Sequence, residues 1–180
     1  MLIVDQTAER NAALQALMKT HRLKKEPSRV RDVYRPFWLG KALYRAETRD
    51  RQTVDGTVIF LADARILSWS IIGAYQHRMV SDMLDLRDHQ VNFTVRERDP
   101  EESAEVLEPL LTQEELSTRS RLLASRRLLA RSMKLGRIVF CDDVEYRLIY
   151  RPYWEIEYET RRGGTDVALV SRDDVLVRKR

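Results

Sequence analysis

The chain has 180 residues, of which 43% are hydrophobic and 33% charged, and its formal net charge is +4. These values are typical of one soluble globular domain and argue against wholesale disorder. The single cysteine, Cys141, excludes an intrachain disulfide and the ligand spacing of a zinc finger. No apolar run is long enough to span a membrane, and the N-terminus lacks a signal-peptide pattern, so we expect a cytoplasmic protein.

Charge is distributed unevenly along the chain. Residues 82–108 carry nine acidic side chains and three arginines, whereas residues 112–137 carry seven basic side chains and two glutamates. Such blocks can neutralise each other within one fold or between two copies, or the basic block can bind an acidic partner.

The N-terminal part predicts a short strand or arm at residues 1–5, followed by a helix. Apolar residues recur at three- and four-residue steps over residues 7–25, and Pro27 should end the helix. Aromatic and β-branched residues then predict strands at 33–46, 57–62 and 65–72. We expect a turn at Asp55-Gly56 and a break at Gly73.

The middle of the chain is less regular. Residues 79–86 favour a helix or an irregular segment, and residues 91–96 alternate like a strand. The run Asp99-Pro100-Glu101-Glu102 is typical of a helix start, since it combines a capping residue, an early proline and early acids.

The C-terminal part begins with a capping box, Thr112 and Glu115, for a helix that we expect to reach Leu135 and to close at Gly136. Strands are predicted at 138–140, 144–160 and 166–177, the last broken near residues 172–173.

A five-residue aromatic segment occurs twice. Tyr-Arg-Pro-Phe-Trp at 34–38 recurs as Tyr-Arg-Pro-Tyr-Trp at 150–154, and the apolar stretches 58–61 and 66–67 align with 167–170 and 175–176. We therefore predict an α+β fold made of two helix-plus-antiparallel-meander repeats, with the helices on one face of the sheet. The first repeat would span residues 1–73 and the second 112–180, joined by an acidic segment at 74–111 in one compact domain. The duplicated structural motif consists of Tyr34, Pro36, Trp38, Tyr150, Pro152 and Trp154.

The second aromatic strand has a period of two. One face would carry Leu148, Tyr150, Pro152, Trp154, Ile156 and Tyr158, and the other Arg151, Tyr153, Glu155, Glu157 and Glu159. This alternation predicts a half-buried strand with one wet face. Proline cannot donate to a ladder, so Pro36 and Pro152 indicate an edge position or a bulge.

The closing strands resemble a known family. An apolar alternating strand, the glycine turn Gly163-Gly164, a second strand ending near Asp173 and a final apolar stretch are similar to the end of a PepSY-type, cystatin-like domain, and the first copy is similar around Gly56 and Asp63. The resemblance implies a small helix-on-sheet fold of the binding or regulatory kind, with no catalytic residues to carry over.

Candidate chemistry is sparse. His77 and His89 lie close in sequence to Asp82, Asp85 and Asp88, which could bind a metal or transfer protons, although such acids more often form a solvated face. The acids after Cys141 should raise the pKa of its thiol and make it less reactive. No nucleotide-binding loop or nucleophile elbow is present, so we expect no cofactor and no metal.

Nucleic-acid binding is the main specific alternative. The helix predicted from residue 112 to 137 and the C-terminal tail are basic, and arginine can meet phosphate while aromatic residues stack on bases. The leucine pairs of the same helix predict an apolar stripe that packs internally or in a homo-oligomer. The candidate contacts to nucleic acid or to an acidic partner are Arg119, Arg126, Arg127, Arg131, Lys134, Arg178, Lys179 and Arg180.

Taken together, the repeated apolar strands, the opposite charge blocks and the missing catalytic groups favour a non-enzymatic protein. We expect a binding, assembly or regulatory function through a protein partner or self-association. The alternatives are a nucleic-acid-binding protein and a metal-dependent or acid–base enzyme that uses His77 and His89.

Overall fold

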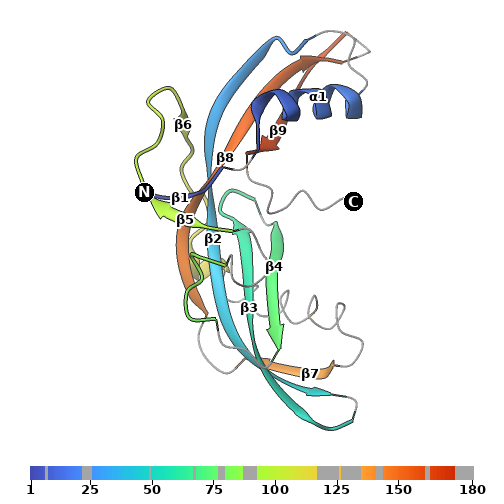
Figure 1. The fold of residues 1–180 in the computed structure, drawn as a ribbon, viewed down its shortest axis with the longest axis vertical. Helices are drawn as coiled ribbons and strands as arrows, with labels where there is room; N and C mark the ends of the chain where they lie inside the picture. Colours follow the sequence, from blue (N-terminus) through green and yellow to red (C-terminus); the bar gives the residue numbers. More distant parts are fainter. Residues whose placement is uncertain are drawn as a thin grey trace.

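The computed structural model describes residues 1–6, 8–21, 26–48, 50–66, 68–76, 80–86, 93–116, 126, 135–140, 144–160 and 163–172. Within these ranges the chain is mostly β, with nine strands in one mixed sheet (Figure 1). The strand order along the main path is β4-β3-β2-β8-β1-β5, while β6 and β7 pair with β2 and β9 pairs with β8. The elements are β1 Leu2–Val4, α1 Arg10–His21, β2 Arg29–Thr48, β3 Thr53–Asp63, β4 Trp69–Gln76, β5 Val95–Glu97, β6 Glu105–Val106, β7 Leu135–Phe140, β8 Glu145–Glu159 and β9 Thr165–Ser171.

Two long strands, β2 and β8, form the centre of the sheet and run side by side along the long axis of the molecule (Figure 1). They are antiparallel, in a register that is unbroken from Arg29 opposite Glu157 to Lys41 opposite Glu145. Each then forms a hairpin with the strand that follows it in the chain, β2 with β3 and β8 with β9. All other strands attach directly or indirectly to this central pair.

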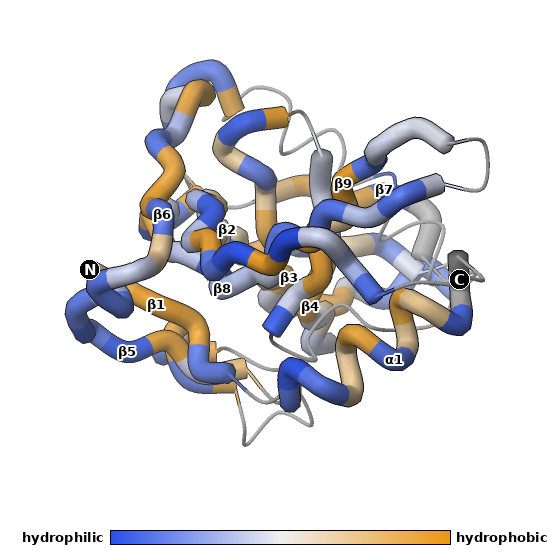
Figure 2. The backbone as a smooth tube through the Cα atoms, turned by 90° about the horizontal axis from the view of Figure 1, so that it is seen from above, coloured by the Kyte–Doolittle hydropathy of each residue, from blue (hydrophilic) through white to orange (hydrophobic). Residues whose placement is uncertain are grey.

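Both faces of the central pair carry hydrophobic clusters, because apolar side chains occupy alternate positions on each face. One cluster gathers Phe37, Leu39 and Ile149 with residues of β1 and of the segment 80–95. On the opposite face, Phe60 and Trp69 pack with ring centroids 4.9 Å apart. The hydropathy view shows these hydrophobic stretches of β3 and β4 inside the molecule, with hydrophilic residues in the segment that follows β5 (Figure 2).

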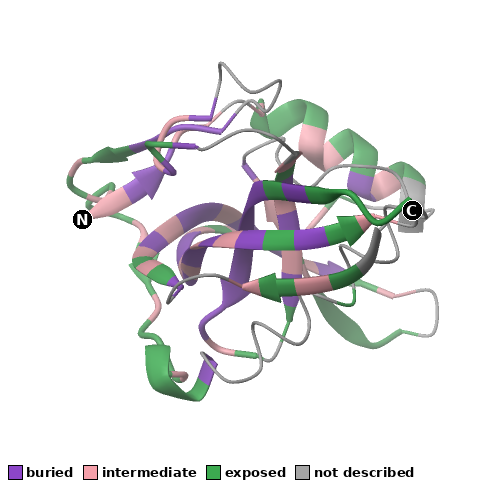
Figure 3. Cartoon of the chain, turned by 90° about the horizontal axis from the view of Figure 1, so that it is seen from below, coloured by how far each residue is buried: buried purple, intermediate pink, exposed green. Residues whose placement is uncertain are grey.

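The helix α1 covers one end of this second face. Its inner side presents Leu14 and Leu17 to Trp154 and Ile156 of β8, while its outer side is exposed (Figure 3). The second predicted helix starts as expected, since the Thr112 hydroxyl accepts a hydrogen bond from the Glu115 amide and the Glu115 carboxylate accepts one from the Thr112 amide. Its first turn, residues 113–116, buries Leu116 on the same face of the sheet. In the part of the chain that the structure describes, no helix is both long and apolar enough to cross a membrane.

Several local predictions were wrong. The acidic run at Asp99 does not start a helix, because β6 follows at Glu105 and pairs with β2. Gly73 does not end its strand but lies within β4, opposite Ile59. Gly136 lies inside β7 and therefore closes no helix. In these three cases pairing with another strand overrides the local signal. The described residues 80–86 are irregular, which agrees with one of the two alternatives predicted for that segment.

The architectural prediction also needs correction. The described residues form one nine-stranded mixed sheet and do not show a duplicated helix-plus-meander repeat. Pro36 and Pro152 lie in the two central strands rather than at an edge or a bulge. On the side of β2 away from β8, Pro36 lies between the residues that pair with β6 and those that pair with β3. On the side of β8 away from β2, Pro152 lies between the residue that pairs with β1 and those that pair with β9. The missing N–H of each proline therefore falls in a gap of the ladder.

Gly40 provides a test of the packing between β2 and β3. A Cβ atom at this position would lie 2.2 Å from Cζ of the buried Phe60 ring, so Gly40→Ala should lower the free energy of unfolding by about 2 kcal/mol through overpacking. Chemical denaturation measures this loss. Gly164→Ala is the control, because its Cβ would come no closer than 3.6 Å to another atom, and an equal loss in both variants would contradict the packing argument.

Candidate functional site

Two arginines face each other at the centre of the β2–β8 pair. Arg35 lies directly opposite Arg151, so both side chains project from the same face of the sheet. The Arg35 Nε donates to Asp63 Oδ2 at 2.8 Å, and an Arg151 Nη atom donates to Ser171 Oγ at 3.0 Å. Each arginine thus binds a polar side chain at the end of a hairpin strand. Asp63 and Ser171 pair with Phe37 and Tyr153, which lie two positions beyond the arginines.

Arg151 is almost fully buried, with 1% of its surface exposed. Its guanidinium carbon lies 5.1 Å from the ring centroid of Phe37 and 5.4 Å from that of Tyr153, and these two rings are stacked. Guanidinium groups are weakly hydrated and interact favourably with aromatic faces, which lowers the cost of burial. This arrangement differs from the wet face that the sequence alternation predicted for Arg151.

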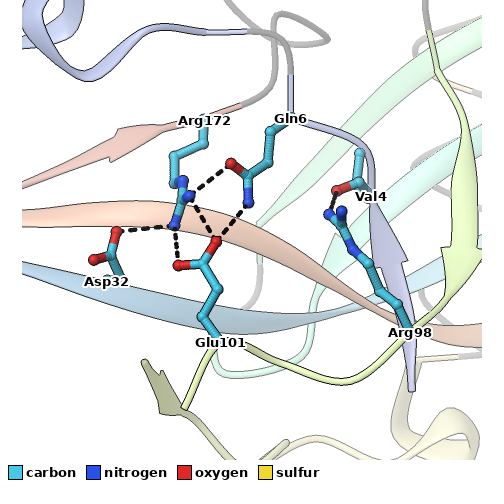
Figure 4. Close-up of polar contacts among 6 residues, drawn as sticks. All are labelled: Val4, Gln6, Asp32, Arg98, Glu101 and Arg172. Atoms are coloured by element: carbon cyan, nitrogen blue, oxygen red, sulfur yellow. Dashed lines mark hydrogen bonds and ion pairs between the residues drawn. The ribbon is translucent and has the colours of Figure 1, made fainter. Parts of the chain in front are cut away.

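A third arginine, Arg172, directly follows β9 and binds side chains from three other segments (Figure 4). Its guanidinium donates to Asp32 Oδ1 at 2.8 Å, to Gln6 Oε1 at 2.6 Å and to Glu101 Oε1 at 3.0 Å. The group also lies over the Trp154 ring, 5.4 Å from its centroid. Gln6 lies on the N-terminal arm, just after β1, Asp32 lies on β2, and Glu101 lies in the acidic turn between β5 and β6. We call this set of contacts the Arg172 clasp.

The carboxylates of the Arg172 clasp are bound by the Arg172 guanidinium. The hydrogen bond from Arg172 holds the pKa of the Glu101 carboxyl below its usual value of 4.5, so this carboxylate is ionised at neutral pH. Arg98 supports the same corner by donating to the Val4 carbonyl at 3.0 Å. With its carboxylates engaged by arginine, the clasp can fix the arm and the turn in place.

A different kind of surface lies at the β9 end of the sheet. On the face not covered by α1, Arg31 forms an ion pair with Glu155 across the strands, and Arg29 lies opposite Glu157. At this end of the sheet β9 pairs with β8 on the side away from β2, and its Val167 and Leu169 are 52% and 42% exposed. Among the residues with described placement, β9 pairs with β8 alone, so its outer edge presents unpaired backbone groups beside exposed apolar side chains.

Most of the predicted site residues lie outside the described ranges. Of the eight candidate contacts to nucleic acid, only Arg126 is described, and it is exposed. His77, His89, Asp88 and Cys141 are likewise outside these ranges. The Asp82 carboxylate accepts a hydrogen bond from the Leu84 amide at 2.8 Å, and the backbone of Asp85 forms an isolated antiparallel β-bridge with that of Thr94. No group of three or more potential metal ligands occurs within the described part of the chain.

The duplicated motif residues come together, because the two segments pair with one another about Arg35 and Arg151. Sequence reasoning missed the importance of the arginines themselves. The repeat contained the signal, since Arg35 and Arg151 are identical in both copies. Arg172 had no comparable signal, because its partners lie up to 166 positions away in the chain.

Comparison with known proteins places the chain in no family, since no family model, no curated protein and no solved structure matches it. The resemblance to PepSY-type domains accordingly stays a prediction.

Removal of the clasp arginine should destabilise the fold. Arg172→Met would leave the carboxylates of Asp32 and Glu101 without their shared cation, and we expect a loss of about 2 kcal/mol in unfolding free energy. Arg96→Met is the matched control, because its ion pair with Asp5 is at the surface, and it should cost less than about 1 kcal/mol. Equal losses in urea denaturation would contradict a special role for Arg172.

The clasp also predicts a pH dependence. Since the folded-state pKa of Glu101 is lowered, its contribution to stability is present above pH 4.5 and is lost as pH falls through the folded pKa. The Glu101 side chain is 45% exposed, so this contribution should stay under about 1 kcal/mol. Urea midpoints from pH 7 to pH 3 should fall less steeply for Glu101→Gln than for the natural chain. Parallel curves for the two proteins would refute the assignment.

Proposed function

We propose that this chain is an assembly protein that associates with a second copy of itself through the outer edge of β9. The observation that carries the proposal is the combination, on one edge strand, of unpaired backbone groups and the exposed Val167 and Leu169 side chains. Edge strands without proline, lysine or a bulge are templates for pairing with another chain, and β9 has none of these three features.

We further infer that the two halves of the chain are copies of one unit, and this supports the choice of β9. Matching hydrogen bonds occur in both halves. The Ala64 amide donates to the Pro36 carbonyl at 3.1 Å, and the Arg172 amide donates to the Pro152 carbonyl at 2.9 Å. Likewise, β6 runs parallel to β2 at Tyr34, and β1 runs parallel to β8 at Tyr150.

The second copy of the proposed unit starts earlier than the sequence indicated, at β6 rather than at residue 112. The unit consists of a short parallel strand, a helix, a long aromatic strand and a hairpin strand, with β1 and β6 as its two starting points. The register also corrects the alignment of the hairpin strands. Leu61 pairs opposite Leu39 and Leu169 opposite Glu155, so Leu61 is the equivalent of Leu169 rather than of Val170.

The comparison of the two proposed units supports one kind of occupant for the β9 edge. In the first unit, β4 lies antiparallel along the outer edge of β3, from Gly56 to Ala62. The equivalent edge of β9 has no such strand among the described residues. An antiparallel strand therefore has the right shape for this position.

A second β9 strand is self-complementary with the first. In an antiparallel pair centred on Ala168, Val167 of one copy lies opposite Leu169 of the other, and the exchange is reciprocal, as a two-fold interface requires. The exposed apolar side chains of both copies would then cover one another, while Ala168 and Val170 stay packed toward α1. The competing occupant is the chain's own segment 173–180.

Sedimentation equilibrium tests the proposal. We expect the natural chain to dimerise reversibly and Val167→Lys/Leu169→Lys to be monomeric, because opposed lysines would repel across the pair. Val139→Lys is the matched control, since Val139 is 49% exposed but lies on β7, and it should leave the dimer intact.

Two results would overturn the proposal. One is a natural chain that stays monomeric at all concentrations. The other is a dimer that forms only after residues 173–180 are deleted, which would identify this segment as the occupant of the edge.

A further inference from the structure

We propose that a shallow pocket at the turn between β2 and β3 binds a small phosphorylated molecule. The hollow has a volume of about 340 Å³ and is lined by Arg45, Ala46, Glu47, Arg51, Thr53, Arg137 and Val139. Its size is at the lower end of small-ligand sites. It lies at the opposite end of β2 from the β9 edge, so it is independent of the proposed self-association (Figure 1).

Three guanidinium groups reach this pocket from three different elements. Arg45 lies on β2, Arg137 lies on the neighbouring β7, and Arg51 lies in the turn. Arg45 is held in position by a two-pronged contact with Asp55, at 2.8 and 3.2 Å. For Arg51 and Arg137, the structure records no ion pair with any residue whose placement it describes, and both are exposed.

The backbone at Arg51 provides the strongest observation. This residue has a φ of 58°, in the left-handed region where side chains other than glycine are strained. Arginine has no local hydrogen bond of the kind that lets asparagine or aspartate tolerate this region. Strain that persists at a folded site is a reason to look for a function there.

The turn between β8 and β9 shows that the strain is avoidable. Thr48 and Thr160 begin the two turns with the same hydrogen bonds. The Thr48 amide donates to the Gln52 carbonyl at 2.8 Å and the Thr160 amide to the Gly164 carbonyl at 2.7 Å, and both hydroxyls accept from the closing amide. The position of Arg51 is occupied there by Gly163, with a φ of 80°. The chain thus uses glycine in one turn and keeps a strained arginine in the turn that lines the pocket.

The charge of the pocket favours an anion of modest size. The lining contains three arginines and Glu47, and Arg45 is bound to Asp55. The charges of these five side chains sum to +1. Guanidinium groups from several directions match the oxygens of a phosphate group. Glu47 opposes this binding, because it lies opposite Arg137 across the strands.

Calorimetric titration with inorganic phosphate and pyrophosphate, at constant ionic strength, tests the proposal. We expect saturable binding of pyrophosphate that is at least tenfold weaker in Arg51→Gly and in Arg137→Gln. Glu47→Gln should bind more tightly than the natural chain. The melting temperature of Arg51→Gly should be unchanged or higher, which separates loss of the ligand from loss of the fold.

Arg147→Gln is the matched control, because it removes the same charge from an exposed position on β8 outside the pocket. An equal loss of affinity in this variant would reduce the effect to net charge and overturn the proposal. The proposal also fails if neither phosphate probe binds to the natural chain or to Glu47→Gln. Binding of a single-stranded oligonucleotide without binding of pyrophosphate would likewise overturn it, in favour of nucleic acid.

Discussion

The antiparallel pairing of β2 with β8 is the constraint on which the rest of the structure depends. Its register sets which side chains point to each face, and a slip of one residue would move Trp154 and Ile156 out of the cluster under α1. On the outer sides of this central pair, the hairpin strands β3 and β9 pair with the residues that follow each proline. The short strands β6 and β1 pair with the residues of β2 and β8 that precede each proline.

The arginines in and near the core are the second theme of the structure, with Arg151 and Arg172 buried and Arg35 half-buried. Arg35, Arg151 and Arg172 lie where hairpins close or separate segments meet, and each has a carboxylate or hydroxyl partner at 3.0 Å or less. Hydrophobic packing supplies most of the free energy of folding but is not directional. Hydrogen bonds from a guanidinium are directional and fix the relative position of the groups they join. We therefore infer that these arginines define how the hairpins and the N-terminal arm join the central pair.

The two proposed binding regions use different physical means at opposite ends of the long strands. At the β9 edge, backbone hydrogen bonds and two apolar side chains would join a second copy. At the β2–β3 turn, arginines from three elements surround a small hollow. Neither region depends on the Arg172 clasp, whose carboxylates are engaged by arginine and whose contacts hold the arm and the acidic turn.

What the sequence alone determined were the features encoded by neighbouring residues. The alternation in β8 correctly predicted that Trp154, Ile156 and Tyr158 are buried, and the capping box at Thr112 was correct, because side-chain period and capping are local. Only the tertiary structure decided that Arg151 is buried, that Asp99 begins no helix and that the prolines lie in central strands. These features depend on which distant strand lies alongside, and no local pattern contains that information.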